Sequence, residues 1–229
     1  MSKALCIIPA RGGSKRIPKK NIREFHGKPI IAYSIETALK SGLFKEVMVS
    51  TDCEEIKKIS QMYGAEVPFL RSETNSNDFA TTVDVVNEVI EAYRNIEMLF
   101  DKICVLYPCA PLASEVDLIK ANQMLTEKSD CVIPVVKFDF PPLRSFEISA
   151  SKLRYKWPKY EKSRSQDLEE LFHDAGQWYF FRNEEKYHES LVKNSTSPII
   201  LESNKVQDID TISDWKLAEL KFQMLNEGV

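Results

Sequence analysis

Several features of other protein classes are missing from this chain of 229 residues. No segment approaches the ~20 consecutive apolar residues that a membrane-spanning helix requires, and the first residues lack the apolar stretch and cleavage site of a signal peptide. The 5 cysteines contain no C-x-x-C pair, and their odd number argues against a disulfide framework or a cysteine metal site. We therefore expect a soluble, cytoplasmic protein with reduced cysteines, and we find no internal repeat.

Acidic residues are missing from one part of the chain. Six cations and no acid lie between Arg11 and Arg23, and Glu24 is the first carboxylate of the sequence, although the whole chain has a net charge of -3. The positive charge is therefore local. The mild overall acidity argues against a general nucleic-acid binder, which normally spreads basic charge over a whole face.

This basic segment directly follows a short apolar strand, Ala4–Pro9, and the combination is typical of a polyphosphate site. Gly12 and Gly13 allow successive backbone amides to approach an anion, the cations supply charge, and Ser14 adds a hydroxyl donor. The segment has neither the third glycine of the dinucleotide fingerprint nor the Gly-Lys-Ser/Thr ending of the Walker A loop. The alternative interpretation is a solvated basic turn, but such turns usually contain some acid.

Short apolar strands alternate with helical periodicities through the first 136 residues, which predicts an α/β fold with a mainly parallel sheet covered by helices. We expect a single domain over residues 1–229. The pattern predicts strands at 4–9, 47–49, 103–106, 131–133, 177–181 and 198–201. It predicts helices over 31–39, 52–64 and 86–93, after Ser114, and after Thr211. Asp52 with Glu55 resembles a capping box, and Gly42 and Gly64 are expected to end helices.

The regular alternation fails over residues 138–172, which we interpret as an insertion. The segment has no helical period and is rich in aromatic and charged residues. Since aromatic residues are scarce in disordered linkers, a binding or subunit-contact subdomain is a better interpretation than disorder.

Asp208 and Asp210 lie between a predicted strand and the last predicted helix. Two carboxylates separated by one residue in a turn can reach the same hard cation, and Mg²⁺ typically joins one or two carboxylates to substrate phosphates. Taken alone, the pair is better explained as acidic charge at the start of a helix. The basic segment near the N-terminus reverses that order, because a polyphosphate needs such a metal.

Further candidates lie near other predicted strand ends. Arg71 follows an apolar segment and could pair with a phosphate or a base carbonyl. Thr81 or Thr82 could contact a nucleotide, although capping of the following helix is the better local interpretation. The segment Leu106–Leu112 ends a strand at the carboxyl edge, where open α/β sheets place their ligands.

The histidines do not form a catalytic set. His173 and Asp174 are adjacent in an extended segment and therefore point to opposite sides, so they are poorly placed to share a proton, although either could touch a ligand. His26 and His188 lie in polar surroundings and are expected at the surface.

Taken together, three groups of motifs resemble the CMP-sugar-acid synthetases, which are the cytidylyltransferases of sialic-acid-like sugars. The motifs are Ala10–Lys15 with Lys20-Asn21, Leu106–Leu112, and Asp208–Thr211, and the resemblance extends over the whole chain. Other segments are similar to the branch that activates pseudaminic acid: Phe140-Pro-Pro, Arg164-Ser-Gln-Asp167 and His173-Asp-Ala-Gly-Gln177. Tyr107 and Ala113 support that branch, because the sialic-acid members usually have glutamine and arginine there.

The resemblance implies a Rossmann-like nucleotidyltransferase fold. It implies transfer of CMP from CTP to the anomeric hydroxyl of a nine-carbon 2-keto sugar acid, release of pyrophosphate, Mg²⁺ as cofactor, and a homodimer formed through the inserted subdomain. The implied catalytic residues are Arg11, Lys20 and Asp210, and the implied metal ligands are Asp208 and Asp210. The implied nucleotide-binding residues are Ala10, Arg11, Gly12, Gly13, Ser14, Lys15, Lys20, Asn21, Arg71, Thr81, Thr82 and Tyr107. The candidates for binding the sugar acid are Arg164, Gln166, Asp167, His173, Asp174 and Gln177.

Other functions remain as alternatives. The acceptor could be sialic (N-acetylneuraminic) or legionaminic acid, because the orientation of one hydroxyl depends on the exact placement of the contacts. A metal-dependent glycosyltransferase would also combine an α/β nucleotide fold with an Asp-x-Asp pair, but it has no need of a dense triphosphate loop. A non-catalytic nucleotide-binding protein would bind CTP without turnover.

Overall fold

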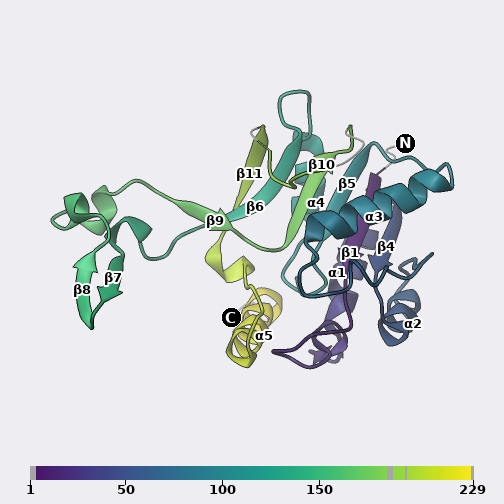
Figure 1. Cartoon of the computed structure of the whole chain (residues 1–229), viewed down its shortest axis with the longest axis horizontal. Coiled ribbons are helices and arrows are strands. Elements are labelled where there is room, and N and C mark those ends of the chain that lie inside the picture. The colour runs from purple at the N-terminus through teal and green to yellow at the C-terminus, as the bar shows by residue number, and fades with distance from the viewer. Residues whose placement is uncertain (1–3, 185–187, 194, 228–229) are drawn as a thin grey trace.

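A computed structural model describes residues 4–184, 188–193 and 195–227, and these residues build a mixed, mainly parallel sheet (Figure 1). The sheet order is β11-β6-β10-β5-β1-β4, and β9 pairs with β6 off this path. Strands β9 and β10 run antiparallel to their neighbours, and the other pairs are parallel. The strands are β1 (Ala4–Pro9), β4 (Phe44–Ser50), β5 (Lys102–Leu106), β6 (Cys131–Lys137), β9 (Phe172–Asp174), β10 (Trp178–Arg182) and β11 (Thr196–Leu201). The prediction of a mainly parallel α/β fold is confirmed.

Helices cover both faces of the sheet, because its central strands carry apolar side chains on both faces. Because side chains alternate across a strand, Cys6 and Ile8 of β1 pack toward α1, α2 and α4, whereas Leu5 and Ile7 pack toward α3. These four side chains are completely buried. The helices are α1 (Ile30–Ser41), α2 (Glu54–Met62), α3 (Thr82–Asn95), α4 (Glu115–Met124) and α5 (Ile212–Glu227).

Several predicted helix ends are confirmed. Gly42 follows α1 in the left-handed region with φ 64°, where glycine has no steric penalty. Ser114 caps α4 by accepting hydrogen bonds from two backbone amides of the first turn. Thr211 and Asp214 bond each other's backbone amides at the start of α5, which is a capping box.

The predicted capping box at the start of α2 is wrong. The helix begins at Glu54, and the preceding residue makes no side-chain cap. Asp52 instead accepts a hydrogen bond from the amide of Gly12 at 2.8 Å, and Glu55 pairs with Lys19 at 2.6 Å. Both acids thus bind the basic loop, a long-range partner that the local spacing could not indicate.

Besides the apolar clusters on the two faces of the sheet, a third cluster joins residues from near the two ends of the chain. Ile17 and Phe25 from the segment after β1 pack with Ile209 and Trp215, and the rings of Phe25 and Trp215 meet edge to face at 5.6 Å. Burial of each such large side chain contributes about 1.5–3 kcal/mol. This packing fixes the basic loop beside the turn that precedes α5. The short elements of this region are η1 (Lys20–Ile22), β2 (Glu24–Phe25), β3 (Lys28–Pro29) and η5 (Ser203–Lys205).

The segment between β6 and β9 leaves the sheet and projects away from it, at the left of Figure 1. Ile148 and Leu153 pair across its antiparallel hairpin, and their side chains are 78% and 65% exposed. The segment contains η2 (Pro142–Arg144), β7 (Phe146–Ser149), β8 (Lys152–Tyr155), η3 (Pro158–Tyr160) and η4 (Ser165–Asp167). It therefore exposes apolar surface that the rest of the described chain does not cover.

The remaining predictions concern cysteines, histidines and membrane segments. The cysteines are free, and Cys6, Cys104 and Cys131 are buried in the sheet, as predicted for reduced packing residues. The surface prediction for His188 is wrong: its ring is completely buried against Phe181 and bonds to Asn183. Over the described part of the chain, none of the helices has the length and apolar character needed to span a bilayer.

Candidate functional site

Residues from the two ends of the chain line one cavity of about 720 Å³. The cavity lies where β1 and β5 end, at Pro9 and Tyr107, which is the carboxyl edge at which parallel sheets place ligands. Nine of the predicted site residues line it: Arg11, Ser14, Lys15, Lys20, Asn21, Tyr107, Asp174, Asp208 and Asp210. The basic loop and the aspartate pair therefore meet in space.

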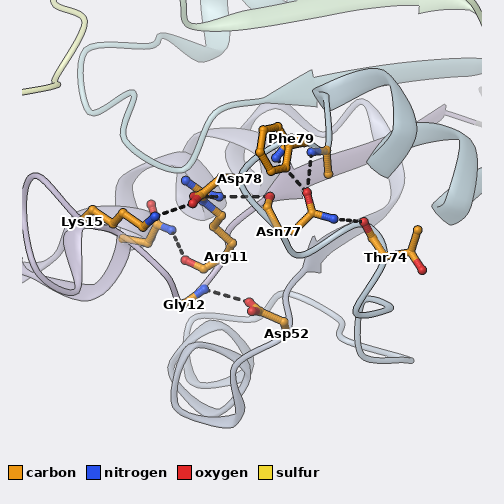
Figure 2. Close-up of polar contacts among 10 residues, drawn as sticks. Arg11, Gly12, Lys15, Asp52, Thr74, Asn77, Asp78 and Phe79 are labelled. Atoms are coloured by element: carbon orange, nitrogen blue, oxygen red, sulfur yellow. Dashed lines mark hydrogen bonds and ion pairs between the residues drawn. The ribbon is translucent and has the colours of Figure 1, made fainter.

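Hydrogen bonds to the end of β4 and the segment after it hold the start of the basic loop in place. The amide of Ala10 donates to the carbonyl of Ser50 at 2.9 Å. The amide of Gly12 donates to Asp52 at 2.8 Å (Figure 2). A Cβ on Gly12 would lie 3.0 Å from the Cβ of Cys53, which is tighter than an ordinary side-chain contact, so the close approach of Cys53 favours glycine there. In this conformation the amide of Gly12 bonds to a carboxylate, which differs from the expected nest of loop amides around phosphate.

Asn21 organises the loop from inside the protein. Its buried side chain donates to the carbonyl of Arg11 at 2.9 Å and accepts from the thiol of Cys109 at 3.3 Å. Burial raises the pKa of Cys109 to about 12, so the thiol stays protonated and can donate. Asn21 thus fixes the start of the loop at the point where its side chain also borders the cavity.

Lys20 connects the loop to the C-terminal turn. Its Nζ donates to the carbonyl of Ile209 at 2.7 Å and lies 3.9 Å from the Asp210 carboxylate. Arg16, which we did not predict as a site residue, pairs with Asp210 at 2.8 Å. Two cations of the loop therefore contact the aspartate turn directly.

The two aspartates suit a divalent cation. Burial raises the pKa of Asp208, the neighbouring charge of Asp210 raises it further, and Lys20 opposes both effects. A cation shared by the two carboxylates would relieve this repulsion. Among the described residues no group of three acidic, histidine or cysteine side chains could hold a metal. The two carboxylates are therefore too few to hold a metal by themselves, and a divalent cation there would complete its coordination with phosphate oxygens and water.

A smaller cavity of about 220 Å³ adjoins the first and shares Pro9, Arg11 and Tyr107 with it. Arg71 lines this cavity but is largely buried, and its guanidinium bonds to the hydroxyl and carbonyl of Ser50. Burial lowers the pKa of Arg71, although an arginine remains charged at neutral pH. The smaller cavity therefore has a cation in its wall, Arg71, whose side chain is held in place by its bonds to Ser50.

Thr81 and Thr82 lie at the wall of the smaller cavity. Thr81 forms a full capping box with Asp84 at the start of α3, which confirms the capping interpretation. The hydroxyls of Thr82 and Tyr107 lie 3.3 Å apart. This contact connects the start of α3 to Tyr107, the residue after β5 that lines both cavities.

Asp174, in β9, is the one predicted sugar-acid residue that borders the large cavity among the described residues. Its carboxylate accepts hydrogen bonds from the amide of Gly176 at 2.7 Å and from the hydroxyl of Tyr179. His173 turns away and packs against Phe138, with ring centroids 4.7 Å apart, as expected for adjacent residues of a strand.

The other predicted sugar-acid residues lie outside both cavities. Gln177 is buried, and its amide donates to the carbonyl of Lys205 at 2.7 Å. Arg164 and Asp167 form an ion pair at 2.7 Å within the inserted segment, and Gln166 lies between them in η4. The described chain therefore does not bring the inserted residues to its own cavity.

Sequence reasoning missed several residues of the site. Asp78 bonds to both Arg11 and Lys15 (Figure 2), yet it lies in a polar loop with no recognisable motif. Tyr179 borders the cavity from a strand that we predicted only as core. Arg16 belongs to the basic stretch, so its charge was a usable signal, whereas its pairing with Asp210 depends on the tertiary fold.

Comparisons with known proteins identify the family of this chain. A family model described as cytidylyltransferase matches residues 5–207. The chain is 42% identical to the pseudaminic acid cytidylyltransferase of Campylobacter jejuni subsp. jejuni serotype O:2, over 99% of each chain. It is 31% identical to the CMP-N,N'-diacetyllegionaminic acid synthase of Legionella pneumophila, over 98% of each chain. A solved CMP:2-keto-3-deoxy-manno-octonic acid synthetase shares the fold with a TM-score of 0.70 at 20% identity, and the match covers 99% of this chain and 100% of that one. The chain therefore belongs to the cytidylyltransferase family.

Proposed function

We propose that this chain transfers CMP from CTP to the anomeric hydroxyl of pseudaminic acid and releases pyrophosphate. The observation that carries the proposal is the meeting of the basic loop and the Asp208–Asp210 turn in one cavity of a cytidylyltransferase-family chain. The full-length similarity to the Campylobacter enzyme supports pseudaminic acid as the acceptor.

The two adjoining cavities suit the two parts of a nucleotide. We place the cytosine base in the smaller cavity, where Arg71 and Thr82 offer fixed polar groups. The triphosphate would then extend over the basic loop, with Arg11 at the junction because it lines both cavities. Lys15 and Lys20 would contact the outer phosphates.

The chemistry follows from this placement. The sugar hydroxyl oxygen forms a bond to the α-phosphorus of CTP, the bond from that phosphorus to the oxygen bridging to the β-phosphate breaks, and the hydroxyl proton leaves to solvent. Negative charge grows on the leaving pyrophosphate, so Arg11, Lys15 and Lys20 stabilise the transition state. Mg²⁺ held by Asp208 and Asp210 would neutralise phosphate charge and lower the pKa of the attacking hydroxyl.

The acceptor half of the site requires the inserted segment. Arg164, Gln166 and Asp167 lie on this projecting segment, and we propose that they reach the cavity of a second copy in a homodimer. The segment exposes an apolar surface suited to such a contact, formed by Phe140, Phe146, Ile148 and Leu153. Asp174 would contact the acceptor from within the same chain.

The proposal is tested by measuring pyrophosphate release from CTP and Mg²⁺ with pseudaminic, N-acetylneuraminic and legionaminic acids offered separately. We expect turnover mainly with pseudaminic acid, together with formation of its CMP ester. Faster turnover with N-acetylneuraminic or legionaminic acid would show that this acid, and not pseudaminic acid, is the acceptor. CTP binding without turnover on any of the three acids would favour a nucleotide-binding protein, and a glycosyltransferase would release no pyrophosphate.

A further inference from the structure

Two cations of the basic loop are bound to one acid of the chain itself. Arg11 donates to the Asp78 carboxylate at 2.9 Å and to the carbonyl of Asn77 at 3.1 Å, and Lys15 pairs with the second oxygen of Asp78 (Figure 2). Asp78 lies more than sixty residues away from both in the sequence, with separations of 67 and 63. The contact is therefore made by the fold.

The turn that carries Asp78 is built by its own hydrogen bonds. The side chain of Asn77 accepts from the amides of Phe79 at 2.7 Å and Ala80 at 3.0 Å, and it donates to the carbonyl of Thr74 at 2.6 Å (Figure 2). These bonds close the backbone around position 77 and present the next side chain to the loop.

The same segment is attached to α3 and borders the smaller cavity. Glu88 of α3 accepts hydrogen bonds from the amide of Ser72 at 2.8 Å and from its hydroxyl at 2.9 Å. Asp78, Asn77 and Ala80 are among the residues that line the smaller cavity. The acid therefore stands on an ordered wall of the nucleotide site and not on a distant surface loop.

The donors that Asp78 occupies are those that a triphosphate would need. Arg11 and Lys15 both line the large cavity, and a carboxylate and a phosphate oxygen accept the same N–H groups. Lys15 and Arg11 hold the pKa of Asp78 below its ordinary value, so the acid is charged at neutral pH. An anion of the protein and an anion of the ligand therefore compete for the same two side chains.

We propose that Asp78 competes with the nucleotide phosphates for Arg11 and Lys15, so that it limits CTP affinity and promotes release of pyrophosphate. This inference rests on the proposed function, because it assumes a triphosphate ligand. The ion pairs are suited to exchange: the side chains of Lys15 and Asp78 are 77% and 44% exposed, and such exposed pairs contribute little stability and break readily. A triphosphate, with several negative charges, displaces a single carboxylate from them.

The test distinguishes this role from the opposite one, in which Asp78 holds Arg11 and Lys15 in the geometry that phosphate requires. The two roles predict opposite changes in the affinity for CTP and pyrophosphate. If Asp78 competes, removal of its charge tightens binding of CTP and pyrophosphate; if it pre-organises the cations, the same change weakens binding.

The test is calorimetric binding of CTP, and separately of pyrophosphate, to Asp78→Asn with Mg²⁺ present and no sugar acid. We expect about three- to tenfold tighter binding of both ligands, the range that loss of two exposed ion pairs allows. The gain should shrink at high salt, which screens exposed charges. Glu55→Gln is the matched control, because it removes an acid that pairs with a neighbouring loop lysine, Lys19, outside both cavities. We expect it to leave both affinities unchanged.

A double-mutant cycle tests whether the gain in affinity depends on the contested cations. In a Lys15→Met background, Asp78→Asn should give a smaller gain, because one of the two contested cations is gone. Asp78→Ser serves as a second variant if the asparagine protein has a lowered melting temperature. Unchanged or weaker binding of CTP and pyrophosphate by the folded Asp78 variants overturns the inference. A wild-type protein that binds neither ligand would instead refute the proposed function.

Discussion

The large cavity and the inserted hairpin differ in how they are built. The cavity lies at the ends of β1 and β5, two strands that are almost entirely buried, and its loop is fixed by Asp52, Asn21 and the apolar cluster around Phe25. The hairpin of β7 and β8 projects from the sheet and exposes its apolar side chains. The cations and acids that line the cavity come from a single chain, whereas the hairpin leaves apolar surface uncovered.

This difference separates the two substrates of the proposed reaction. The cations and acids that would act on CTP converge within one chain, so nucleotide binding should not require a second copy. Three of the acceptor candidates sit on the projecting segment, so use of the sugar acid should depend on assembly. Four predictions test or sharpen this contrast.

The largest effect is expected for Lys20→Met, which removes a cation that bonds to the Ile209 carbonyl and faces Asp210. Loss of one positioned donor to the leaving group should lower the rate of pyrophosphate release by about 10²–10³-fold. Lys19→Met is the matched control, because the adjacent lysine pairs with Glu55 outside the cavity, and this variant should keep its activity. Equal losses in the two variants would remove Lys20 from the proposed mechanism.

The next effect concerns the metal. Asp210→Asn removes one of two carboxylate ligands, so the Mg²⁺ concentration for half-maximal turnover should rise by at least about tenfold. Arg16→Met removes the cation paired with Asp210 and leaves the carboxylate, so it should not raise the Mg²⁺ requirement. The measurement is a Mg²⁺ titration of pyrophosphate release; an unchanged titration for Asp210→Asn would contradict the assignment.

A smaller effect is expected in the hairpin. Ile148→Glu places a charge on its exposed apolar face and should weaken self-association by about tenfold, measured by sedimentation over a range of concentrations. Turnover with the sugar acid should fall in parallel, whereas the affinity for CTP should stay the same.

Ser149→Glu is the matched control for the hairpin, because neighbouring residues of a strand point to opposite faces. It adds the same charge to the other side and should leave the association constant unchanged. A hairpin variant that loses CTP affinity would contradict the separation of the two regions.

The smallest effect is expected for Thr81→Ala. Loss of the capping box at the start of α3 should lower the free energy of unfolding by about 1 kcal/mol, measured by urea denaturation. Thr82→Val keeps the cap and should change stability less. An alanine variant of unchanged stability would show that the cap contributes nothing here.

Much of the fold could be predicted from local pattern. The strand Ala4–Pro9, the buried face of α3 and the glycine after α1 follow directly from apolar period and turn chemistry. The start of α2 could not be predicted, because Asp52 accepts its hydrogen bond from the distant amide of Gly12 and does not cap the helix. His188 was misplaced for a similar reason, since its ring bonds to Asn183 and its backbone bonds to Asn87, which lies 101 residues away in the chain.

The candidate site was predictable in its residue types and less so in their contacts. The basic loop and the Asp208–Asp210 pair were recognisable because each is a dense local cluster of one charge. The roles of Asp78 and Arg16 were not, because each depends on one partner distant in the chain. Gln177 matched a motif, yet its side chain is used to hold the backbone at Lys205.

The sequence alone determined the class of this protein: a mainly parallel α/β sheet, a loop of concentrated positive charge after the first strand, and a pair of carboxylates before the last helix. These are properties of residues that are close together in the sequence, so the apolar periodicity and the local density of charge indicate them directly. Only the tertiary structure decided that the loop and the carboxylates share a cavity, that Asp78 occupies two of the loop's cations, and that the inserted segment stands apart. Those contacts join residues far apart in the chain, and they are set by how the sheet and the cluster around Trp215 pack.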